Sequence, residues 1–275
     1  MIICKLRNIA FKFLTITLLI LYFNCHSQAE KNGAPILVTK ITNVSSGNSI
    51  TFKYDGTKII ETTDGELKSL YNYTGNVITQ IKEYENDELI KTADITYHKN
   101  GTLKRIKVDG ISKDYGHYTE DQIFTYPTPF TIMCTEFEFY DNYEDKKPHK
   151  LSTVYTVDKG NIVLKKDSSF EGKSVEMEVL TSYTYNKNNN PYLNILGYDK
   201  IMPYILESYD EFMSGKNNMT HYRLFQRKQS PDLGLTTNFE ILYNKNNFPE
   251  KIVSKYYNKD GILYDNITYT YMYNQ

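Results

Sequence analysis

The acidic residues of one strand-like segment are the first candidates for chemistry. Glu136 and Glu138 alternate with Phe137 and Phe139, and alternate residues of a strand share a face, which places the two carboxylates about 7 Å apart. A glycoside hydrolase can use such a pair as its acid and its base. The same alternation is typical of a half-buried strand with phenylalanine inside and glutamate in solvent. We favour this second interpretation, because no other feature of the sequence supports hydrolysis.

Residues of the types that bind metals are scattered along the chain. The histidines form no H-x-H or H-x-x-x-H pair of the kind that zinc sites contain; they are His26, His98, His117, His149 and His221. Asp141, Glu144 and Asp145 could offer oxygen ligands to calcium, but their segment lacks the glycine and the ligand spacing of a calcium-binding loop. Cys134 lies in an apolar run without a neighbouring histidine, which indicates a core residue. We therefore predict no catalytic residue, no metal site and no cofactor.

Tyrosine dominates the segments that must position any site. The chain of 275 residues contains 26 Tyr and no Trp, and tyrosine favours strands. Apolar residues recur with period two from Ile50 onward, as in the run from Ile267 to Tyr273, which is the pattern of strands with one buried face. Turn pairs separate these runs, and they are Asp55-Gly56, Asp64-Gly65, Gly75-Asn76, Asn100-Gly101, Asp109-Gly110, Lys159-Gly160 and Asp260-Gly261. We predict an all-β fold: a meandering antiparallel sheet of repeated hairpins that can be curled, with at least ten strands in a single domain over residues 30–275; an open ribbon, a half-barrel and a closed barrel all fit this pattern.

One segment departs from the strand pattern. Its apolar residues fall at helical spacing, and they are Ile205, Leu206, Tyr209, Phe212 and Met213. Pro203 suits the first turn of a helix, and Gly215 suits the position after its end. The sequence predicts one short helix near 203–214 that covers a face or an end of the sheet. A lid over a ligand is the alternative.

The N-terminus is organised like a bacterial signal peptide. Lys5, Arg7 and Lys12 precede an apolar run over 13–23, which is too short to cross a membrane as a helix. The end of this run, residues 21–25, resembles the lipobox of bacterial lipoproteins, and the resemblance implies lipidation of Cys25. We predict a signal peptide over 1–25 and an exported, membrane-anchored lipoprotein of the bacterial envelope. The competing cleavage site at Ser27-Gln28-Ala29 would release a soluble periplasmic or secreted protein.

The charge balance excludes one class of partner. The formal net charge is −1, and it becomes −4 when the three basic residues of the signal peptide are removed. Nucleic-acid binding requires clustered lysine and arginine. We therefore expect no nucleic-acid partner, and contact with the membrane only through an N-terminal lipid.

The predicted hairpins resemble one another. Each contains a tyrosine and continues through a turn of Gly or Asn into an apolar strand, as at 71–78, 95–103, 183–191 and 242–249. Tyr54, Tyr73 and Tyr97 mark successive units. At these residues the chain resembles exported Bacteroidota proteins with degenerate YD-type, Rhs-like repeats, a family largely without assigned function. The stretch from Tyr185 to Gly197 carries most of this resemblance.

Three functions remain in competition. The leading hypothesis is a non-enzymatic envelope protein that binds or scaffolds an envelope or extracellular ligand, a glycan or a protein, through tyrosine-rich sheet surface. The first alternative is a glycan-active hydrolase that uses the Glu136 and Glu138 pair. The second is a half-barrel carrier of lipid or lipoprotein, with an apolar cavity under the predicted helix.

Overall fold

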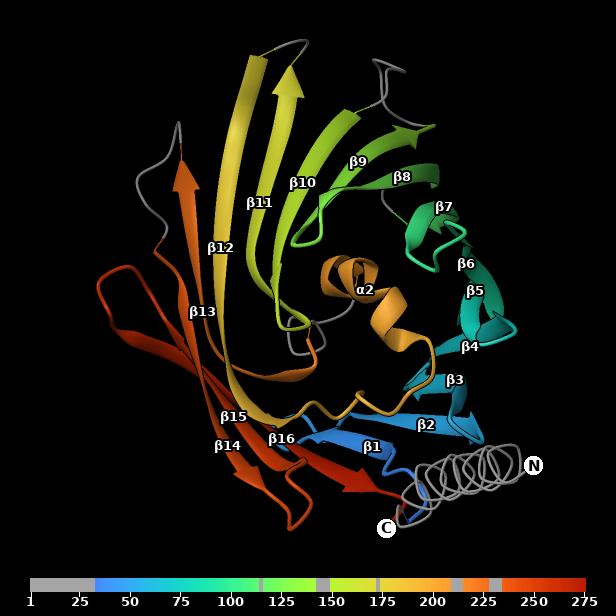
Figure 1. Cartoon of the computed structure of the whole chain (residues 1–275). Coiled ribbons are helices and arrows are strands. Elements are labelled where there is room, and N and C mark those ends of the chain that lie inside the picture. Colours follow the sequence, from blue (N-terminus) through green and yellow to red (C-terminus); the bar gives the residue numbers. More distant parts are fainter. Residues whose placement is uncertain (1–32, 114–115, 142–148, 172–173, 209–214, 228–233) are drawn as a thin grey trace, which may run out of the picture. The chain divides into compact units, whose positions relative to one another are not determined.

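The chain folds into a closed antiparallel barrel (Figure 1). The computed structural model describes residues 33–113, 116–141, 149–171, 174–208, 215–227 and 234–275. Sixteen strands lie in this part of the chain, each paired with the next, and the last is paired with the first. The strands are β1 (Val38–Asn43), β2 (Ser49–Asp55), β3 (Lys58–Asp64), β4 (Leu67–Thr74), β5 (Val77–Glu85), β6 (Glu88–Tyr97), β7 (Leu103–Ser112), β8 (Gly116–Thr128), β9 (Thr131–Tyr140), β10 (His149–Asp158), β11 (Asn161–Glu171), β12 (Ser174–Asn189), β13 (Asn217–Arg227), β14 (Thr236–Tyr243), β15 (Pro249–Tyr257) and β16 (Leu263–Tyr273).

The predicted all-β meander of hairpins is confirmed, and the sheet closes fully into a barrel, where the sequence predicted a sheet that could be curled. Ile41 of β1 pairs with Tyr271 of β16, and the neighbouring residues continue this antiparallel register. An even number of up-and-down strands brings the last strand back antiparallel to the first. Pairing these two strands satisfies backbone groups that two free sheet edges would leave exposed.

The predicted turns join consecutive strands, with one exception. Gly56, Gly65 and Gly75 adopt positive φ between paired strands, as tight hairpins require. Gly110 instead lies inside β7 with its backbone extended, and the ring of Tyr118 packs over it. A β carbon at Gly110 would stand 2.6 Å from that ring, so this glycine makes room for an aromatic side chain on the next strand.

Both faces of the barrel wall are mixed: apolar residues and a few charged ones such as Lys91 lie on the inner face, and the outer face carries ion pairs beside exposed apolar residues such as Ile111 and Met272. Ile106 and Phe124 are buried on the inner face of β7 and β8, whereas Arg105 and Asp121 form a two-hydrogen-bond ion pair on the outer face, with N–O distances of 2.6 and 2.5 Å. Further cross-strand pairs of the outer face are Lys53–Glu61 (2.6 Å), Lys166–Glu178 (2.5 Å) and Lys255–Glu240 (2.5 Å). These pairs lie on four different hairpins around the barrel.

The recurring tyrosines form a ring at one end of the barrel. Four of them lie near the ends of even-numbered strands, and each of these hydroxyls donates a hydrogen bond to a backbone carbonyl: Tyr54 to Val38, Tyr97 to Ile78, Tyr185 to Ile162 and Tyr273 to Pro249, at 2.6–2.8 Å. In each case the acceptor lies at the start of the preceding strand. Each of these tyrosines therefore provides a hydrogen bond that joins the two strands of its hairpin.

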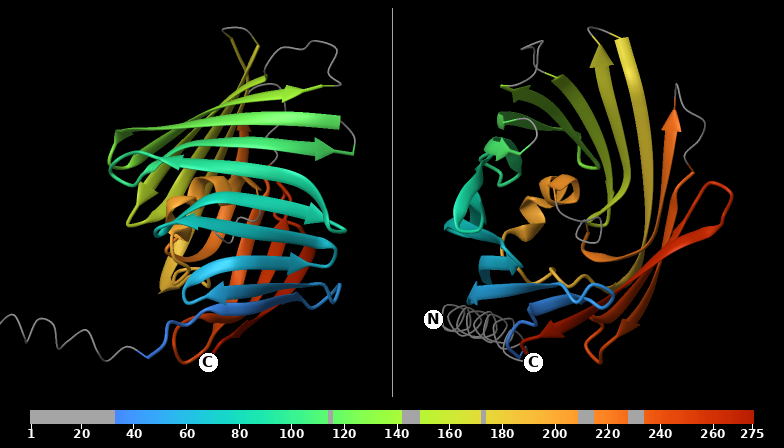
Figure 2. Two further views of the ribbon diagram at one scale, coloured as in Figure 1. Left: turned by 90° about the vertical axis from the view of Figure 1, so that its right-hand side faces the viewer. Right: turned by 180° about the vertical axis from the view of Figure 1, so that it is seen from behind.

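A segment inside the barrel, residues 190–208, connects β12 towards β13 and is named here the inner segment. It contains a 3₁₀ turn, η1 (Tyr198–Lys200), and the helix α2 (Met202–Ser208). Figures 1 and 2 show α2 surrounded by the strands. Ile201, Tyr204 and Ile205 are each at most 1% exposed. The predicted helix is thus present over its first part, and residues 209–214 lie outside the described residues.

Backbone hydrogen bonds fix the inner segment to the end that carries the tyrosine ring. The amide of Leu196 donates to the carbonyl of Thr57 at 2.9 Å, and its carbonyl accepts from the Tyr73 hydroxyl at 3.1 Å. The side-chain amide of Asn194 donates to Ile36 at 2.9 Å. Neither helix in the described part of the chain has the length and apolar character to cross a membrane.

Candidate functional site

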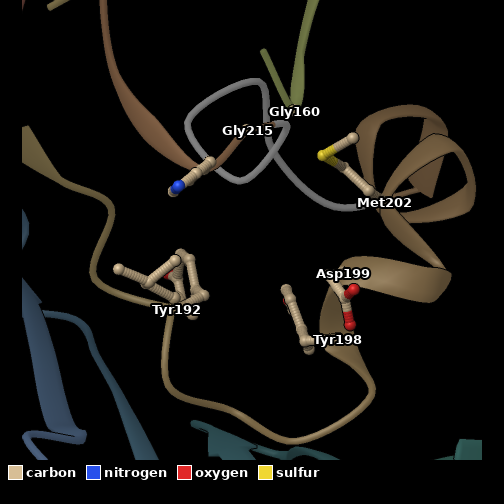
Figure 3. A pocket seen from close by; sticks show the side chains of 8 residues that line it. Gly160, Tyr192, Tyr198, Asp199, Met202 and Gly215 are labelled. Atoms are coloured by element: carbon tan, nitrogen blue, oxygen red, sulfur yellow. The ribbon is translucent and has the colours of Figure 1, made fainter. Parts of the chain in front are cut away.

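A cavity of about 340 Å³ lies between the inner segment and the adjoining strand ends (Figure 3). Tyr192 and Tyr198 stand on one side of it, and their rings stack at 5.4 Å between centroids with a tilt of 20°. Asp199 and Met202 complete the contribution of the inner segment. The remaining lining comes from Leu193, Gly160, Gly215 and Lys216. Small-molecule sites have this size and this mixture of aromatic lining with few polar groups.

The walls of this cavity are held by buried contacts. Asn190 accepts a hydrogen bond from the amide of Tyr192 at 2.9 Å, and the ring of Phe52 packs against Tyr192 at 6.0 Å. On the far side, Asn161 bonds both the backbone and the side chain of Asn217, at 2.9 and 3.0 Å. The two stacked tyrosines are therefore set in place by the barrel wall before any ligand binds.

A second cavity of about 180 Å³ lies on the inner face of β2 to β5. Tyr198 lines this cavity as well as the first, together with Phe52, Tyr71 and Glu83. Burial raises the pKa of Tyr71 to about 12. The ring of Tyr198 thus takes part in the lining of both cavities.

The inner segment contacts a charged group on the barrel wall. The amine of Lys91 lies 3.2 Å from Glu83 and 5.6 Å from the centre of the Tyr204 ring. Burial lowers the pKa of Lys91, but nearby Tyr204 and Glu83 raise it more, so its pKa lies above the ordinary value. Lys91 is therefore a half-buried cation that joins β5, β6 and α2.

Three carboxylates meet on the inner face of β8 and β9. Glu120 pairs with Glu138 across the two strands, and one oxygen of each of Glu120, Glu136 and Glu138 lies within 4.8 Å of the others. Burial raises the pKa of Glu120, Lys91 opposes this, and the charges of Glu138 and Glu83 add to the increase. Like charges at this spacing repel one another unless a proton or a cation lies between them.

Gln122 belongs to the same part of the inner wall. It pairs in register with Glu136, and its amide nitrogen donates to that carboxylate at 3.2 Å. The side chain is 4% exposed, and its buried oxygen has no hydrogen-bond partner among the described residues. An unpartnered buried oxygen is costly.

The structure corrects one interpretation of the sequence and supports another. Glu136 and Glu138 were expected in solvent, yet they face the interior, on the same side of β9 as Cys134. Cys134 is 4% exposed and pairs with Phe124, as expected of a core residue.

The histidines do not gather at a site in the described part of the chain. His221 bonds Asn238 at 2.7 Å, and His98 lies against Tyr126. His117 lies 3.4 Å from both Asp109 and Asp141. For His149 the structure gives the backbone pairing with Glu138. Cys25, His26, Glu144 and Asp145 lie outside the described residues.

Sequence reasoning missed the residues of the interior. Tyr192 and Tyr198 follow Asn190-Pro191 and precede the predicted helix, in a stretch for which the sequence predicted no site. Glu120 and Lys91 stand in ordinary strand patterns, and only the register between strands brings them towards Glu138 and Glu83. The one available signal was the turn-rich run over 186–200, which interrupts the hairpin rhythm.

Comparison with known proteins yields a likeness of fold. No family model matches the chain, and no curated protein matches it, so the resemblance to YD-type repeat proteins stays a prediction. A porin-like protein from Bacteroides vulgatus ATCC 8482 is similar in structure, with 16% identity and a TM-score of 0.57 over 86% of this chain and 99% of that one. A porin-like protein from Bacteroides uniformis ATCC 8492 has 12% identity and a TM-score of 0.47, over 86% and 96% of the two chains. The first of these similarities supports the barrel fold of this chain.

Proposed function

We propose that this protein is an exported, non-enzymatic binding protein whose barrel wall faces water and whose ligand occupies the cavity beside Tyr192 and Tyr198. The observation that carries the proposal is the distribution of polarity. The outer face carries ion pairs on four hairpins, whereas the interior holds the inner segment and a tyrosine-lined cavity.

The outer face argues against a wall in contact with lipid. A membrane-spanning barrel carries an outward apolar band about 25 Å tall with aromatic residues at both borders, and an arginine or lysine at its centre costs about 2–4 kcal/mol. Here Arg105 and Lys166 occupy outward positions inside their strands. The side-chain amide of Asn72 on β4 donates a hydrogen bond to the Gln80 side-chain oxygen on β5 at 3.0 Å. The Gln80 amide in turn donates to the Asp94 carboxylate on β6 at 2.8 Å. Water satisfies such a surface, and hydrocarbon does not.

The inner segment argues against a continuous channel. Its helix lies among the strands (Figure 2), and Ile201, Ile205 and Leu206 are buried. The porin-like names of the two similar proteins describe those proteins, and a pore in this chain would require the inner segment to leave the barrel. Its hydrogen bonds to Thr57, Tyr73 and Ile36 oppose such a movement.

The cavity defines the kind of ligand that we expect. Stacked tyrosines offer flat apolar surface, and Asp199 and Lys216 offer one charge of each sign at its lining. A small molecule with a planar or apolar face and a polar group fits this lining. The glycan hydrolase does not account for this cavity, because the paired carboxylates Glu136 and Glu138 lie elsewhere on the inner wall, on β9. The lipid carrier does not account for it either, because the volume of 340 Å³ is at the low end for ligand sites.

A cavity-filling substitution tests the binding proposal. Leu193 lines the cavity and is 39% exposed, so Leu193→Trp should fill the space while the fold is retained. Leu242→Trp, on the outer face at 59% exposure, adds the same indole elsewhere. We expect the mature protein to bind the probe 1-anilinonaphthalene-8-sulfonate saturably, Leu193→Trp to weaken this binding at least tenfold, and Leu242→Trp to leave it unchanged. Equal binding by both variants would contradict the assignment of the cavity.

Behaviour in detergent and in a bilayer tests the water-facing wall. The chain from residue 26, which omits Cys25 and its predicted lipid, should remain monodisperse in buffer without detergent and should give no stable conductance steps in a planar lipid bilayer. Aggregation without detergent together with regular conductance steps would show a membrane channel instead.

A further inference from the structure

The carboxylates of β8 and β9 have the spacing of ligands to one cation. Calcium binds oxygen at 2.3–2.6 Å, so oxygens on opposite sides of one ion are separated by about 5 Å. The oxygens of Glu120, Glu136 and Glu138 lie within 4.8 Å of one another. A single ion can therefore contact all three side chains without movement of the strands.

Gln122 gives an independent indication of a ligand. Its side chain is 4% exposed and points to the inner face between Glu120 and Phe124. Its nitrogen bonds Glu136, whereas its buried oxygen has no hydrogen-bond partner among the described residues. Because both amide atoms are attached to one carbon, the oxygen lies in the same part of the inner wall as Glu136, to which the nitrogen bonds. A neutral oxygen of this kind is a common calcium ligand.

We propose that Glu120, Glu136 and Glu138, with the side-chain oxygen of Gln122, bind a divalent cation inside the barrel, and that calcium is the preferred ion. The four donors are all oxygen atoms, which suit calcium, magnesium or manganese rather than zinc or copper. They come from neighbouring positions on two adjacent strands, and flexible coordination of this kind suits calcium better than the strict octahedron of magnesium. The site is separate from the tyrosine-lined cavity and does not depend on the function proposed for it.

Terbium luminescence offers a direct assay, because terbium replaces calcium at oxygen sites and is excited through nearby aromatic rings. The chain contains no Trp, so tyrosine must be the donor. Tyr118 and Tyr140 pair across the same two strands, two residues beyond Glu120 and Glu138, and their rings stack at 5.9 Å. Terbium bound at the carboxylates would lie next to this tyrosine pair.

The experiment uses the mature protein after treatment with EDTA. We expect saturable terbium luminescence that calcium displaces with at least tenfold higher apparent affinity than magnesium. Calcium at a hundred times its dissociation constant should also raise the melting temperature by about 5–10 °C. Glu138→Gln should weaken calcium binding at least tenfold, and Gln122→Leu should weaken it severalfold.

Glu240→Gln is the matched control, because Glu240 is a carboxylate of the outer face that pairs with Lys255. It should leave calcium binding unchanged. The proposal is overturned if wild-type protein shows neither displaceable luminescence nor a thermal shift with calcium. It is equally overturned if Glu138→Gln and Glu240→Gln bind calcium as wild type does. If Glu138→Gln fails to fold, the wild-type thermal shift and the Gln122→Leu variant still decide the outcome.

Discussion

The position of Gly197 allows the docking of the inner segment to be tested by a single methyl group. Gly197 has φ of +76°, a backbone conformation that costs a non-glycine residue about 1–2 kcal/mol. A β carbon at this residue would also lie 2.8 Å from the carbonyl oxygen of Asn76 and 3.2 Å from the α carbon of Val77. These are backbone atoms of the β4–β5 turn, so no side-chain rotation can relieve the contact.

The expected loss of stability in Gly197→Ala is the sum of these two contributions. Overpacking at a well-packed contact costs about 1–3 kcal/mol, and together with the backbone penalty Gly197→Ala should destabilise the protein by about 2–5 kcal/mol. Gly56 provides the control: its φ is +60°, and no atom lies within 4 Å of a β carbon built there. Gly56→Ala should therefore cost the backbone penalty alone, about 1–2 kcal/mol.

Thermal unfolding measured by circular dichroism distinguishes the two variants. For a chain of this size, 1 kcal/mol lowers the melting temperature by about 2–4 °C. We expect a decrease of about 2–8 °C for Gly56→Ala and of about 4–20 °C for Gly197→Ala, with Gly197→Ala the larger of the two. Equal decreases would show that the inner segment does not rest against the β4–β5 turn, and the proposed cavity would lose its support.

Three further predictions concern the wall and the N-terminus. Tyr97→Phe removes the hydroxyl that donates to Ile78 at 2.6 Å, and it should destabilise the barrel by about 1 kcal/mol in urea unfolding; no change would show that water replaces this bond. Arg105→Leu should cost less than about 1 kcal/mol at pH 7, because the pair with Asp121 is partly exposed. The hydrogen bond from Arg105 lowers the pKa of Asp121. The ion pair therefore stabilises the folded protein above the ordinary carboxyl pKa of about 4, and this stabilisation is lost as the pH falls below that value. The urea midpoints of Arg105→Leu and wild type should converge in acid. Mass spectrometry of the exported protein should find a lipidated Cys25 as the first residue, and an unmodified start at Glu30 would show a soluble product.

Local patterns were sufficient to predict the strands and most turns, because both depend on neighbouring residues. Period two and positive-φ turn residues describe single hairpins, and the structure contains these hairpins in order. Closure depends instead on the pairing of β1 with β16, whose paired residues Ile41 and Tyr271 are separated by most of the chain. No local pattern distinguishes a closed sheet from an open one with the same hairpins.

Gly110 illustrates a limit of turn prediction. Asp-Gly between apolar residues is a strong hairpin signal, yet Asp109-Gly110 continues β7. The reason lies on the neighbouring strand, where the ring of Tyr118 occupies the place of the missing side chain. A glycine that makes room for an aromatic ring has the same local sequence as one that forms a turn, and only the register between the strands separates the two cases.

The orientation of β9 could have been predicted from the alternation of its residues between the two faces of the strand. Residues 134, 136 and 138 must share one face of a strand, so a buried Cys134 and solvent-exposed Glu136 and Glu138 are incompatible expectations. The structure resolves the conflict by placing all three inside, where Cys134 meets Phe124 and the glutamates meet Gln122 and Glu120. The phenylalanines of β9 then face outward, and Phe139 is 44% exposed. Three carboxylates this close on a partly buried wall repel one another unless a proton or a cation reduces their charge, which is the physical reason to look for a cation there.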